Sequence, residues 1–265
     1  MGIEVIKNKL HLHYFLYEIV HHCNLNCKGC DHCAPIAEEE YVELKQYKND
    51  LKQLKKHFDV VNSFAIMGGE PLLHPNLQEI MKISRKILKN TYITICTNGI
   101  ELEKQNEKFW TTCKKEKIII IITKYKININ LKQIYETAKK YGVEIFIEKN
   151  KEKEFFHKIK FNLDGTENKE EVYKNCFHGK ICHQVENGIL YKCPLVCASK
   201  HFNKYFNKDI RIEETDGLNL YKKLKKEDII EYFEKPIPFC KYCNMEEREE
   251  NKEWGISKKE ITEWT

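Results

Sequence analysis

The chain has 265 residues, of which 42% are hydrophobic and 32% are charged. This length and composition exclude a disordered chain and allow a hydrophobic core that needs no disulfide bonds. The net charge of +5 comes from 45 basic and 40 acidic residues with interleaved signs, so it does not indicate a nucleic-acid-binding stripe.

The longest apolar run, Ile118–Ile122, is too short for a membrane span, and the N-terminus lacks a secretory hydrophobic segment. We therefore expect a cytoplasmic protein without a membrane partner. In that compartment its twelve cysteines are expected to be metal ligands or catalytic groups before they form disulfides.

The first half of the chain alternates short apolar stretches with stretches of helical period. Strands are predicted at 14–20, 60–67, 92–96, 118–123 and 143–147, and helices at 44–58, 77–88 and 131–141. This alternation is typical of an α/β fold with a parallel sheet. Because ligands collect at the carboxyl ends of such strands, the loops after the first three strands are expected to face one site.

The pattern changes after about residue 155. One more strand is predicted at 155–161, and two short ones at 181–185 and 189–192 form a hairpin around the Asn187-Gly188 turn. A helix is predicted at 218–233, with Pro236 and Pro238 ending it. We place the boundary between two domains at residues 158 and 159.

Three cysteines lie within eight residues directly after the first predicted strand. Cys23, Cys27 and Cys30 are separated by three and then two residues, and three such thiolates suit one soft metal centre. With Cys33 as a fourth ligand the site would be structural zinc or a saturated cluster, but zinc knuckles and bacterial ferredoxins use other spacings. An iron–sulfur cluster on three cysteines leaves one iron open to a ligand.

Polar turns follow the next three strands. The turn Gly68-Gly69-Glu70-Pro71 lets the backbone approach a ligand closely, and its carboxylate suits a cationic amino group. Thr97-Asn98-Gly99 ends the third strand, and Thr123 ends the fourth with a hydroxyl that suits a ribose. For these last two, an ordinary polar turn is an equally good interpretation.

The CxxxCxxC motif followed by GGEP resembles the radical SAM superfamily. The resemblance implies a partial (β/α)6 TIM-like barrel and a [4Fe–4S] cluster on Cys23, Cys27 and Cys30, whose open iron chelates S-adenosylmethionine. One electron, from a flavodoxin- or ferredoxin-type donor, then cleaves the sulfonium to a 5′-deoxyadenosyl radical. Residues 68–71 and Thr97-Asn98 correspond to positions near that cofactor. The sequence departs from the family at Gly29, where an aromatic residue is usual.

Six further cysteines lie beyond residue 170. Gly188, followed five positions later by Cys193, resembles the G-x4-C element of SPASM/twitch auxiliary-cluster domains, and the absence of any cysteine after Cys243 favours the truncated twitch form. The resemblance implies a small C-terminal α+β iron–sulfur domain at residues 159–265 with an auxiliary [4Fe–4S] cluster. Its ligands are then Cys176, Cys193, Cys240 and Cys243. Cys182 in place of Cys176, and zinc in place of the cluster, stay open.

The remaining cysteines are interpreted as packing groups or as hydrogen-atom donors. Cys197 is the first choice for a thiol that returns a hydrogen atom to a substrate radical, and Cys182 is the second. Cys96 and Cys113 are expected to pack in the core, and Cys33 to be a spare thiol near the first cluster.

By resemblance we expect an oxidoreductase or epimerase that abstracts hydrogen from a small polar substrate such as a sugar, an aminocyclitol or a nucleotide-sugar. The chain starts about a dozen residues before its first strand, which we take to leave no room for a peptide-leader-binding domain. Peptide maturation with a separate leader-binding partner stays open, as does a non-enzymatic electron carrier, which the GGEP turn disfavours. His32, Glu148 and Lys149 are candidates for substrate contacts.

Overall fold

A single mixed sheet joins the two halves of the chain in the computed structural model, which describes residues 2–147 and 155–265. Its strands are β1 (Ile3–Ile6), β2 (Lys9–Glu18), β3 (Val60–Met67), β4 (Tyr92–Thr97), β5 (Ile118–Ile122), β6 (Ile145–Ile147), β8 (Gln184–Glu186), β9 (Ile189–Tyr191) and β10 (Gly217–Asn219). The strand order is β10-β9-β8-β2-β3-β4-β5-β6, and β1 pairs with β2. The run from β8 to β6 is parallel, which confirms the predicted α/β fold with a partial barrel.

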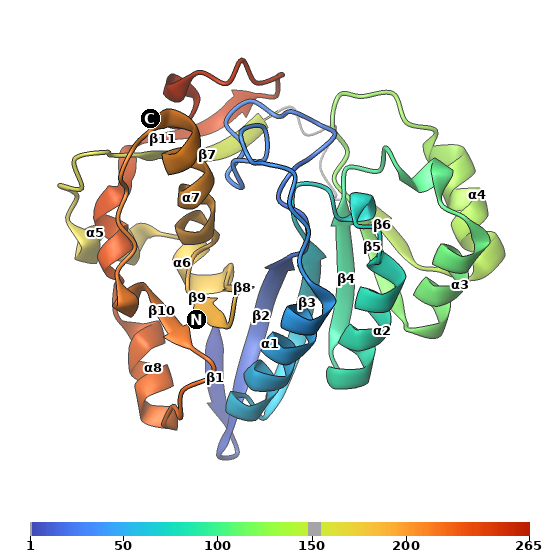
Figure 1. The fold of residues 1–265 in the computed structure, drawn as a ribbon, viewed down its shortest axis with the longest axis horizontal. Helices are drawn as coiled ribbons and strands as arrows, with labels where there is room; N and C mark the ends of the chain where they lie inside the picture. Colours follow the sequence, from blue (N-terminus) through green and yellow to red (C-terminus); the bar gives the residue numbers. More distant parts are fainter. Residues whose placement is uncertain (1, 148–154) are drawn as a thin grey trace.

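Four helices cover one face of the parallel strands (Figure 1). They are α1 (Leu44–His57), α2 (Leu77–Ile87), α3 (Glu107–Lys115) and α4 (Leu131–Tyr141). Each turns an apolar stripe toward the sheet; α1, for example, buries Tyr47, Leu51 and Leu54. The three helices predicted here are confirmed to within one residue, whereas α3 lies where no helix was predicted.

The C-terminal half adds four helices beside β8–β10. They are α5 (Lys169–Asn175), α6 (His178–Ile181), α7 (Pro194–Phe206) and α8 (Lys226–Glu234). Helix α7 was not predicted; it starts directly after Cys193 with a proline in its first turn. The helix predicted at 218–233 is wrong in its first part, because Leu218 pairs with Leu190 between β10 and β9. Strand pairing here outweighs the helical spacing of the apolar residues.

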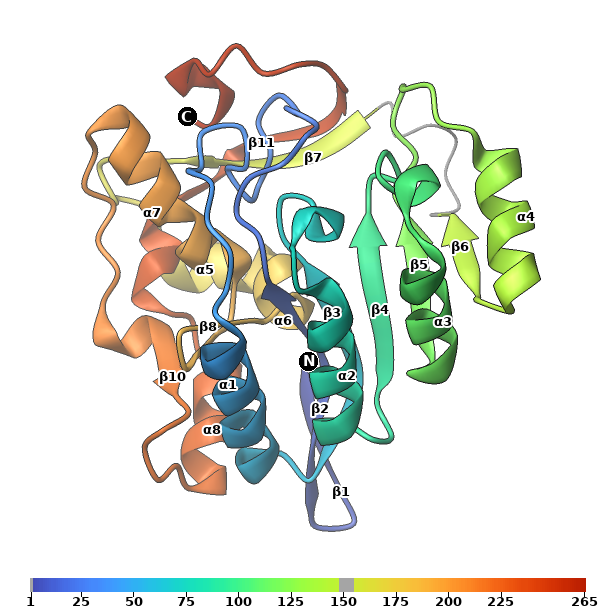
Figure 2. The ribbon, with the colours of Figure 1, turned by 45° about the vertical axis from the view of Figure 1, so that its right-hand side comes forward.

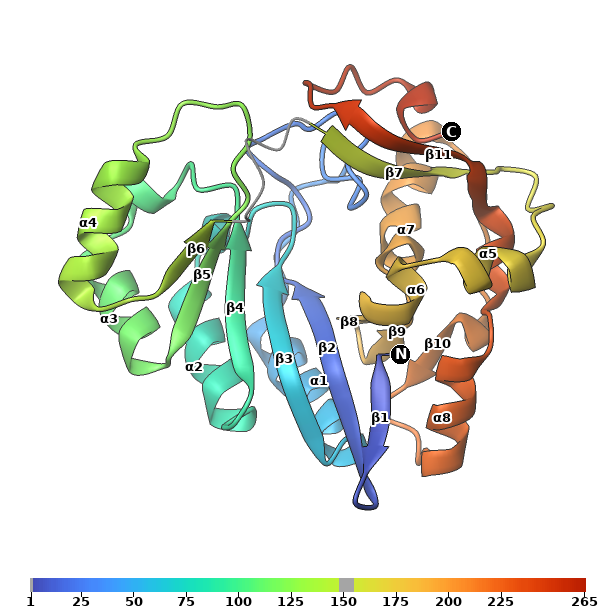
Figure 3. The same ribbon diagram turned by 180° about the vertical axis from the view of Figure 1, so that it is seen from behind.

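A separate antiparallel ribbon lies over the carboxyl ends of the central strands (Figures 1 and 3). It consists of β7 (Phe155–Phe161) and β11 (Cys243–Glu253). The strand predicted at 155–161 is thereby confirmed. None of the helices in the described part of the chain has the length and apolar character that a bilayer crossing requires.

Two hydrophobic cores each draw residues from both sides of the predicted domain boundary. The larger core lies between the sheet and its helices and includes Val185 and Leu190 from the C-terminal half. The smaller core lies among the C-terminal helices and includes Cys33 and Ile36 from the N-terminal half. The two halves are therefore packed together by burial as well as by the sheet.

Candidate active site

The first cysteine loop leaves the carboxyl end of β2 and passes beside the β7–β11 ribbon (Figure 2). Two of its sulfurs accept hydrogen bonds from N–H groups: Leu25 N donates to Cys23 Sγ at 3.3 Å, and Trp254 Nε1 donates to Cys27 Sγ at 3.2 Å. Donors directed at sulfur favour the thiolate, which is the form that binds iron.

The three thiols of this loop influence one another electrostatically. Burial raises the pKa of Cys23 to about 12 and the pKa of Cys30 well above its usual value, and the nearby Cys27 adds to both. Metal binding at this loop must therefore displace protons. Among the described residues, no three Cys, His, Asp or Glu side chains converge tightly enough to hold one metal ion.

Cys33 differs from these three thiols in its surroundings. It is fully buried in the smaller hydrophobic core, and its backbone amide donates to Cys30 O at 2.9 Å. Its role in the structure is packing.

The glycines of the GGEP turn are required by the backbone that runs beside them. A Cβ atom on Gly68 would lie 2.2 Å from Val20 O, and one on Gly69 would lie 2.1 Å from His22 O. Gly69 N donates to Val20 O at 2.8 Å. The end of β3 is thus held directly against the segment that enters the cysteine loop. From the sequence these glycines were expected to let a ligand approach the backbone, and this contact was not predicted.

Glu70 connects the GGEP turn after β3 with the Thr97-Asn98-Gly99 turn after β4. It is fully buried, and its carboxylate accepts hydrogen bonds from Thr97 Oγ1 at 2.8 Å, Asn98 N at 2.9 Å and Leu72 N at 3.0 Å. Burial raises the pKa of Glu70 to about 7, against the lowering effect of these donors. Pro71 begins the short helical turn Pro71–Leu73 beneath it.

Asn98 connects this carboxylate to the cysteine loop. Its Nδ2 donates to Asn24 Oδ1 at 2.8 Å and lies 3.7 Å from Cys23 Sγ. Thr123 follows β5, and its amide donates to Thr97 O at 2.9 Å. The structure thus brings together the predicted cysteine, GGEP and Thr-Asn-Gly loops at one edge of the sheet.

The chain's last described segment, 254–265, packs against the cysteine loop. Lys28 N donates to Gly255 O at 2.7 Å, and Trp264 Nε1 donates to Cys30 O at 2.9 Å. Gly29 adopts φ +60°, a left-handed conformation that disfavours side chains, and its amide donates to Glu263 Oε2 at 3.2 Å. This geometry gives a physical reason for glycine at the position that departs from the family pattern.

The second cysteine set gathers where α5, β9 and β11 meet. Burial raises the pKa of Cys193 and of Cys243 well above the usual value, and the other thiols of the set add to it in both cases. Burial likewise raises the pKa of Cys240 to about 11, with Cys176 adding to the rise. Gly179 N donates to Cys176 Sγ at 3.3 Å. The four predicted ligands are therefore close neighbours in space.

Cys182 and Cys197, the two candidate hydrogen-atom donors, lie in different surroundings. Burial raises the pKa of Cys182 to about 11 and Cys176 adds to it, so Cys182 lies at the edge of the second cysteine set. Cys197 lies in α7 and is 4% exposed. Burial and the carboxylates of Glu186 and Glu18 raise the pKa of the Cys197 thiol well above its usual range.

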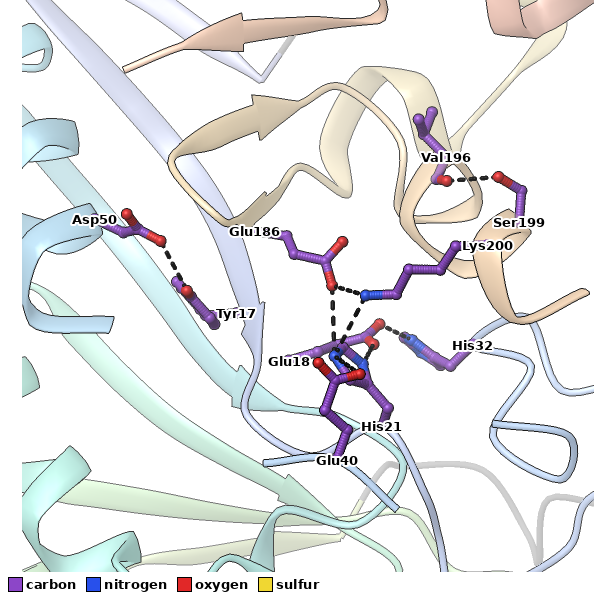
Figure 4. A network of polar contacts seen from close by, with 10 residues as sticks. All are labelled: Tyr17, Glu18, His21, His32, Glu40, Asp50, Glu186, Val196, Ser199 and Lys200. Atoms are coloured by element: carbon purple, nitrogen blue, oxygen red, sulfur yellow. Dashed lines mark hydrogen bonds and ion pairs between the residues drawn. The ribbon is translucent and has the colours of Figure 1, made fainter. Parts of the chain in front are cut away.

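A buried polar network connects the end of β2 with β8 and α7 (Figure 4). His32 Nδ1 lies 2.5 Å from Glu18 Oε1, and His21 lies 3.5 Å from both Glu18 Oε2 and Glu186 Oε1. Lys200 Nζ donates to Glu186 Oε1 at 2.5 Å. Burial tends to raise the pKa of Glu18, but His32 and His21 outweigh it and hold this pKa well below its usual range.

This network forms one wall of a pocket of about 520 Å³. The pocket lies between the end of β2, the start of α1 and the β8–β9 turn, and Glu18, His21, Glu40, Tyr41, Gln46 and Glu186 are among its lining residues. Its volume is within the range of small-molecule sites, and most of its lining residues carry polar or charged groups. His32, a predicted substrate contact, reaches the network, whereas Glu148 and Lys149 lie outside the described residues.

A comparison with protein-family models shows which family the barrel belongs to. The model of the radical SAM superfamily matches residues 17–152, just over half of the chain. The chain belongs to the radical SAM superfamily. Members of this superfamily are enzymes that bind a [4Fe–4S] cluster and S-adenosylmethionine. Three thiols on one loop, at the carboxyl ends of the parallel strands, form a donor set that fits such a cluster.

Curated relatives match part of this radical SAM protein. The subtilosin biosynthesis protein AlbA of Bacillus subtilis is 32% identical over 113 residues, which are 42% of this chain and 24% of AlbA. The GTP 3′,8-cyclase of Helicobacter pylori is 32% identical over 92 residues, which are 34% of this chain and 29% of the cyclase. The matched part thus spans less than a third of either relative.

One solved structure resembles this radical SAM protein over most of its length. The crystal structure of BtrN in complex with AdoMet and 2-DOIA aligns with a TM-score of 0.54, covering 87% of this chain and 92% of BtrN. Sequence identity is 17%, so the likeness is one of fold.

Several residues at the site were not predicted from the sequence. Glu18, Glu186 and Lys200 meet through strand pairing and helix packing between segments far apart in the chain. The available signal was weak: Glu18 lies near the end of one predicted strand, and Glu186 directly follows another. Trp254 gave no signal, because its partner Cys27 is 227 residues away.

Proposed function

We propose that this radical SAM enzyme reductively cleaves S-adenosylmethionine and abstracts a hydrogen atom from a small polar substrate. The main support is that the cysteine loop, the GGEP turn and the Thr97-Asn98 turn lie together at the carboxyl ends of the parallel strands. The bound cluster and cofactor supply the radical chemistry. The chain binds the cluster through Cys23, Cys27 and Cys30, and Glu70 holds the two turns in place.

We further propose an auxiliary [4Fe–4S] cluster on Cys176, Cys193, Cys240 and Cys243. Four neighbouring thiols support it, three of them buried and that of Cys240 partly exposed, as does Gly188 five positions before Cys193. Zinc on the same four thiols is the alternative, and metal analysis distinguishes the two.

The pocket beside Glu18 and Glu186 is our proposed substrate site. Carboxylate and imidazole groups hydrogen-bond hydroxyl and amino groups, and this supports a sugar-like or aminocyclitol-like substrate over an apolar one. After hydrogen abstraction, the substrate radical has two outcomes. Loss of one electron to the auxiliary cluster and of one proton gives oxidation. A hydrogen atom from the Cys197 thiol gives epimerisation, and one electron and one proton then restore the thiol.

A peptide substrate is the second candidate. The specific observation in its favour is the 32% identity to AlbA, a bacteriocin biosynthesis protein, over 113 residues. In this candidate a separate leader-binding partner presents the peptide, and a flavodoxin- or ferredoxin-type donor supplies electrons in either case.

The first experiment counts iron and follows cofactor cleavage under anaerobic conditions. We expect about eight irons per chain and formation of 5′-deoxyadenosine on reduction. A Cys27→Ala variant should retain about four irons and make no 5′-deoxyadenosine, while a Cys96→Ala variant serves as the matched control with eight. Bound zinc, or no cleavage by fully loaded protein, would refute the proposed activity.

The second experiment distinguishes the two outcomes for the substrate radical. Turnover in D₂O with a panel of amino sugars and aminocyclitols should place deuterium in the product only if an exchangeable thiol donates the hydrogen atom. Cys197→Ala should then lose the deuterated product and Cys182→Ala should keep it. The reverse pattern would assign Cys182, and deuterium-free oxidised product from the unmodified enzyme would exclude a thiol donor.

A further inference from the structure

Lys192 is an ammonium group buried without a carboxylate partner. The residue is fully buried, and its Nζ donates hydrogen bonds to the backbone oxygens of Tyr232 and Lys235. Two aromatic faces enclose it, because Nζ lies 4.5 Å from the ring centroid of Tyr173 and 4.7 Å from that of Tyr232. Within the described residues Lys192 takes part in no ion pair.

Such burial is costly unless negative charge compensates it. Moving a charged amine out of water is strongly unfavourable, and hydrogen bonds to neutral groups recover only part of that cost. The two carbonyls belong to the C-terminal end of α8, where the helix carries about half a negative charge, and the ring faces add a smaller attraction. None of these groups carries a full negative charge.

The second cysteine set is the neighbour that can supply this charge. Lys192 directly precedes Cys193, and it lies close enough to Cys240 for their charges to interact. Tyr173, whose ring faces the ammonium, lies near Cys176 and Cys240. Four thiolates outweigh the positive charge of a [4Fe–4S] core, so the ligated cluster is an anion, whereas four protonated thiols carry no charge.

We propose that Lys192 is the internal counter-charge of the auxiliary cluster, where it stabilises the anionic cluster and raises its reduction potential. This inference rests on the proposed auxiliary cluster. Charge near an iron–sulfur centre is one of the factors that set its potential, and it acts strongly where solvent is excluded. Lys192 is a positioning residue in this sense, and it is not expected to touch the substrate.

A solvent-exposed lysine beside the same cluster offers the matched control. Lys241 directly follows Cys240, but its side chain is 33% exposed and pairs with Glu213 at 2.9 Å. Water and this carboxylate screen its charge. The variants to compare are Lys192→Met, Lys192→Arg and Lys241→Met, each loaded with iron and sulfide as the complete chain.

The measurement is a redox titration of both clusters by EPR, preceded by an iron count. In the Lys192→Met variant with eight irons bound, the ratio of reduced to oxidised auxiliary cluster at a fixed potential should be about tenfold lower. This corresponds to a reduction potential lower by about 59 mV for one electron. Lys192→Arg and Lys241→Met should stay close to the unmodified enzyme. The cluster on the first cysteine loop should keep its potential in all three variants, as an internal reference.

The outcomes separate this inference from the proposed function. Four irons in the unmodified enzyme would refute the auxiliary cluster itself. Eight irons with an unchanged potential in Lys192→Met would overturn the role of Lys192 alone. Loss of the auxiliary cluster in Lys192→Met with retention in Lys192→Arg would support the charge role, and loss in both would overturn it in favour of packing.

Discussion

Glu70 shows how one buried side chain can hold the ends of two neighbouring strands together. Its two carboxylate oxygens accept hydrogen bonds from Thr97, Asn98 and Leu72. A carboxylate has about four acceptor positions, so most of its capacity is already used inside the protein. Its main contribution in the structure is therefore to align the ends of β3 and β4.

The raised pKa of Glu70 predicts a pH-dependent stability. Because the folded-state pKa of about 7 lies above the unfolded value of 4.5, this group stabilises the fold fully below pH 4.5, and the contribution is lost as pH rises through 7. Relative to Glu70→Gln, the unmodified protein should lose about 3 kcal/mol of unfolding free energy between pH 4.5 and 8. Urea titration of both cluster-loaded proteins across this range is the measurement.

A constant difference between the two proteins at all pH values would contradict this prediction. Glu79→Gln is a suitable comparison, because Glu79 is an exposed carboxylate on α2 paired with Lys82 at 2.6 Å. Its replacement should leave the pH profile between 5 and 8 nearly unchanged.

The junction between the end of β3 and the segment after β2 depends on having no side chain at Gly69. An added Cβ would meet the backbone oxygen of His22, and backbone cannot rotate away as a flexible side chain can. We expect Gly69→Ala to cost about 1–3 kcal/mol of stability and to lower iron loading of the first cluster. Anaerobic reconstitution with iron counting and urea titration would measure both.

Gly255 provides the matched replacement. It also lies beside the cysteine loop, but a Cβ there would meet no atom within 4 Å. Gly255→Ala should load iron like the unmodified protein. Equal losses in the two variants would show that the clash with His22 is not the cause.

The elements that could be predicted from the sequence are those whose signal is local. Five isoleucines in a row define β5, and the spacing of Cys23, Cys27 and Cys30 identifies their loop without any tertiary information. The helix misplaced over 218–225 failed because its apolar residues pair with β9, a choice made by the sheet. The polar network of Glu18 and Glu186 was invisible because its geometry exists only after β8 has paired with β2.

The molecule as a whole is tied together across the predicted boundary at residues 158 and 159. Asp50 of α1 accepts hydrogen bonds from Gly188 N at 3.0 Å and from Tyr221 Oη at 2.9 Å, both in the C-terminal half. Burial of such an acceptor makes its partners costly to lose. Together with the shared sheet and the two mixed cores, this predicts that neither half unfolds alone.

Two buried tryptophans allow this prediction to be tested. Trp110 reports on the barrel and Trp264 on the C-terminal half, and both are at most 4% exposed. Variants that keep only one of them should show coincident urea transitions by fluorescence. Two transitions with separate midpoints would instead indicate two independently stable domains.

The packing of residues 254–265 against the cysteine loop also sets an order of events during synthesis. Trp254 and its partner Cys27 are 227 residues apart. At about 5–20 residues per second, roughly 10–45 s of translation separate the emergence of the two. Throughout that interval the nascent cysteine loop lacks the N–H donor and the backbone contacts that this segment brings. We therefore expect stable iron loading of this loop only after residues 254–265 have left the ribosome.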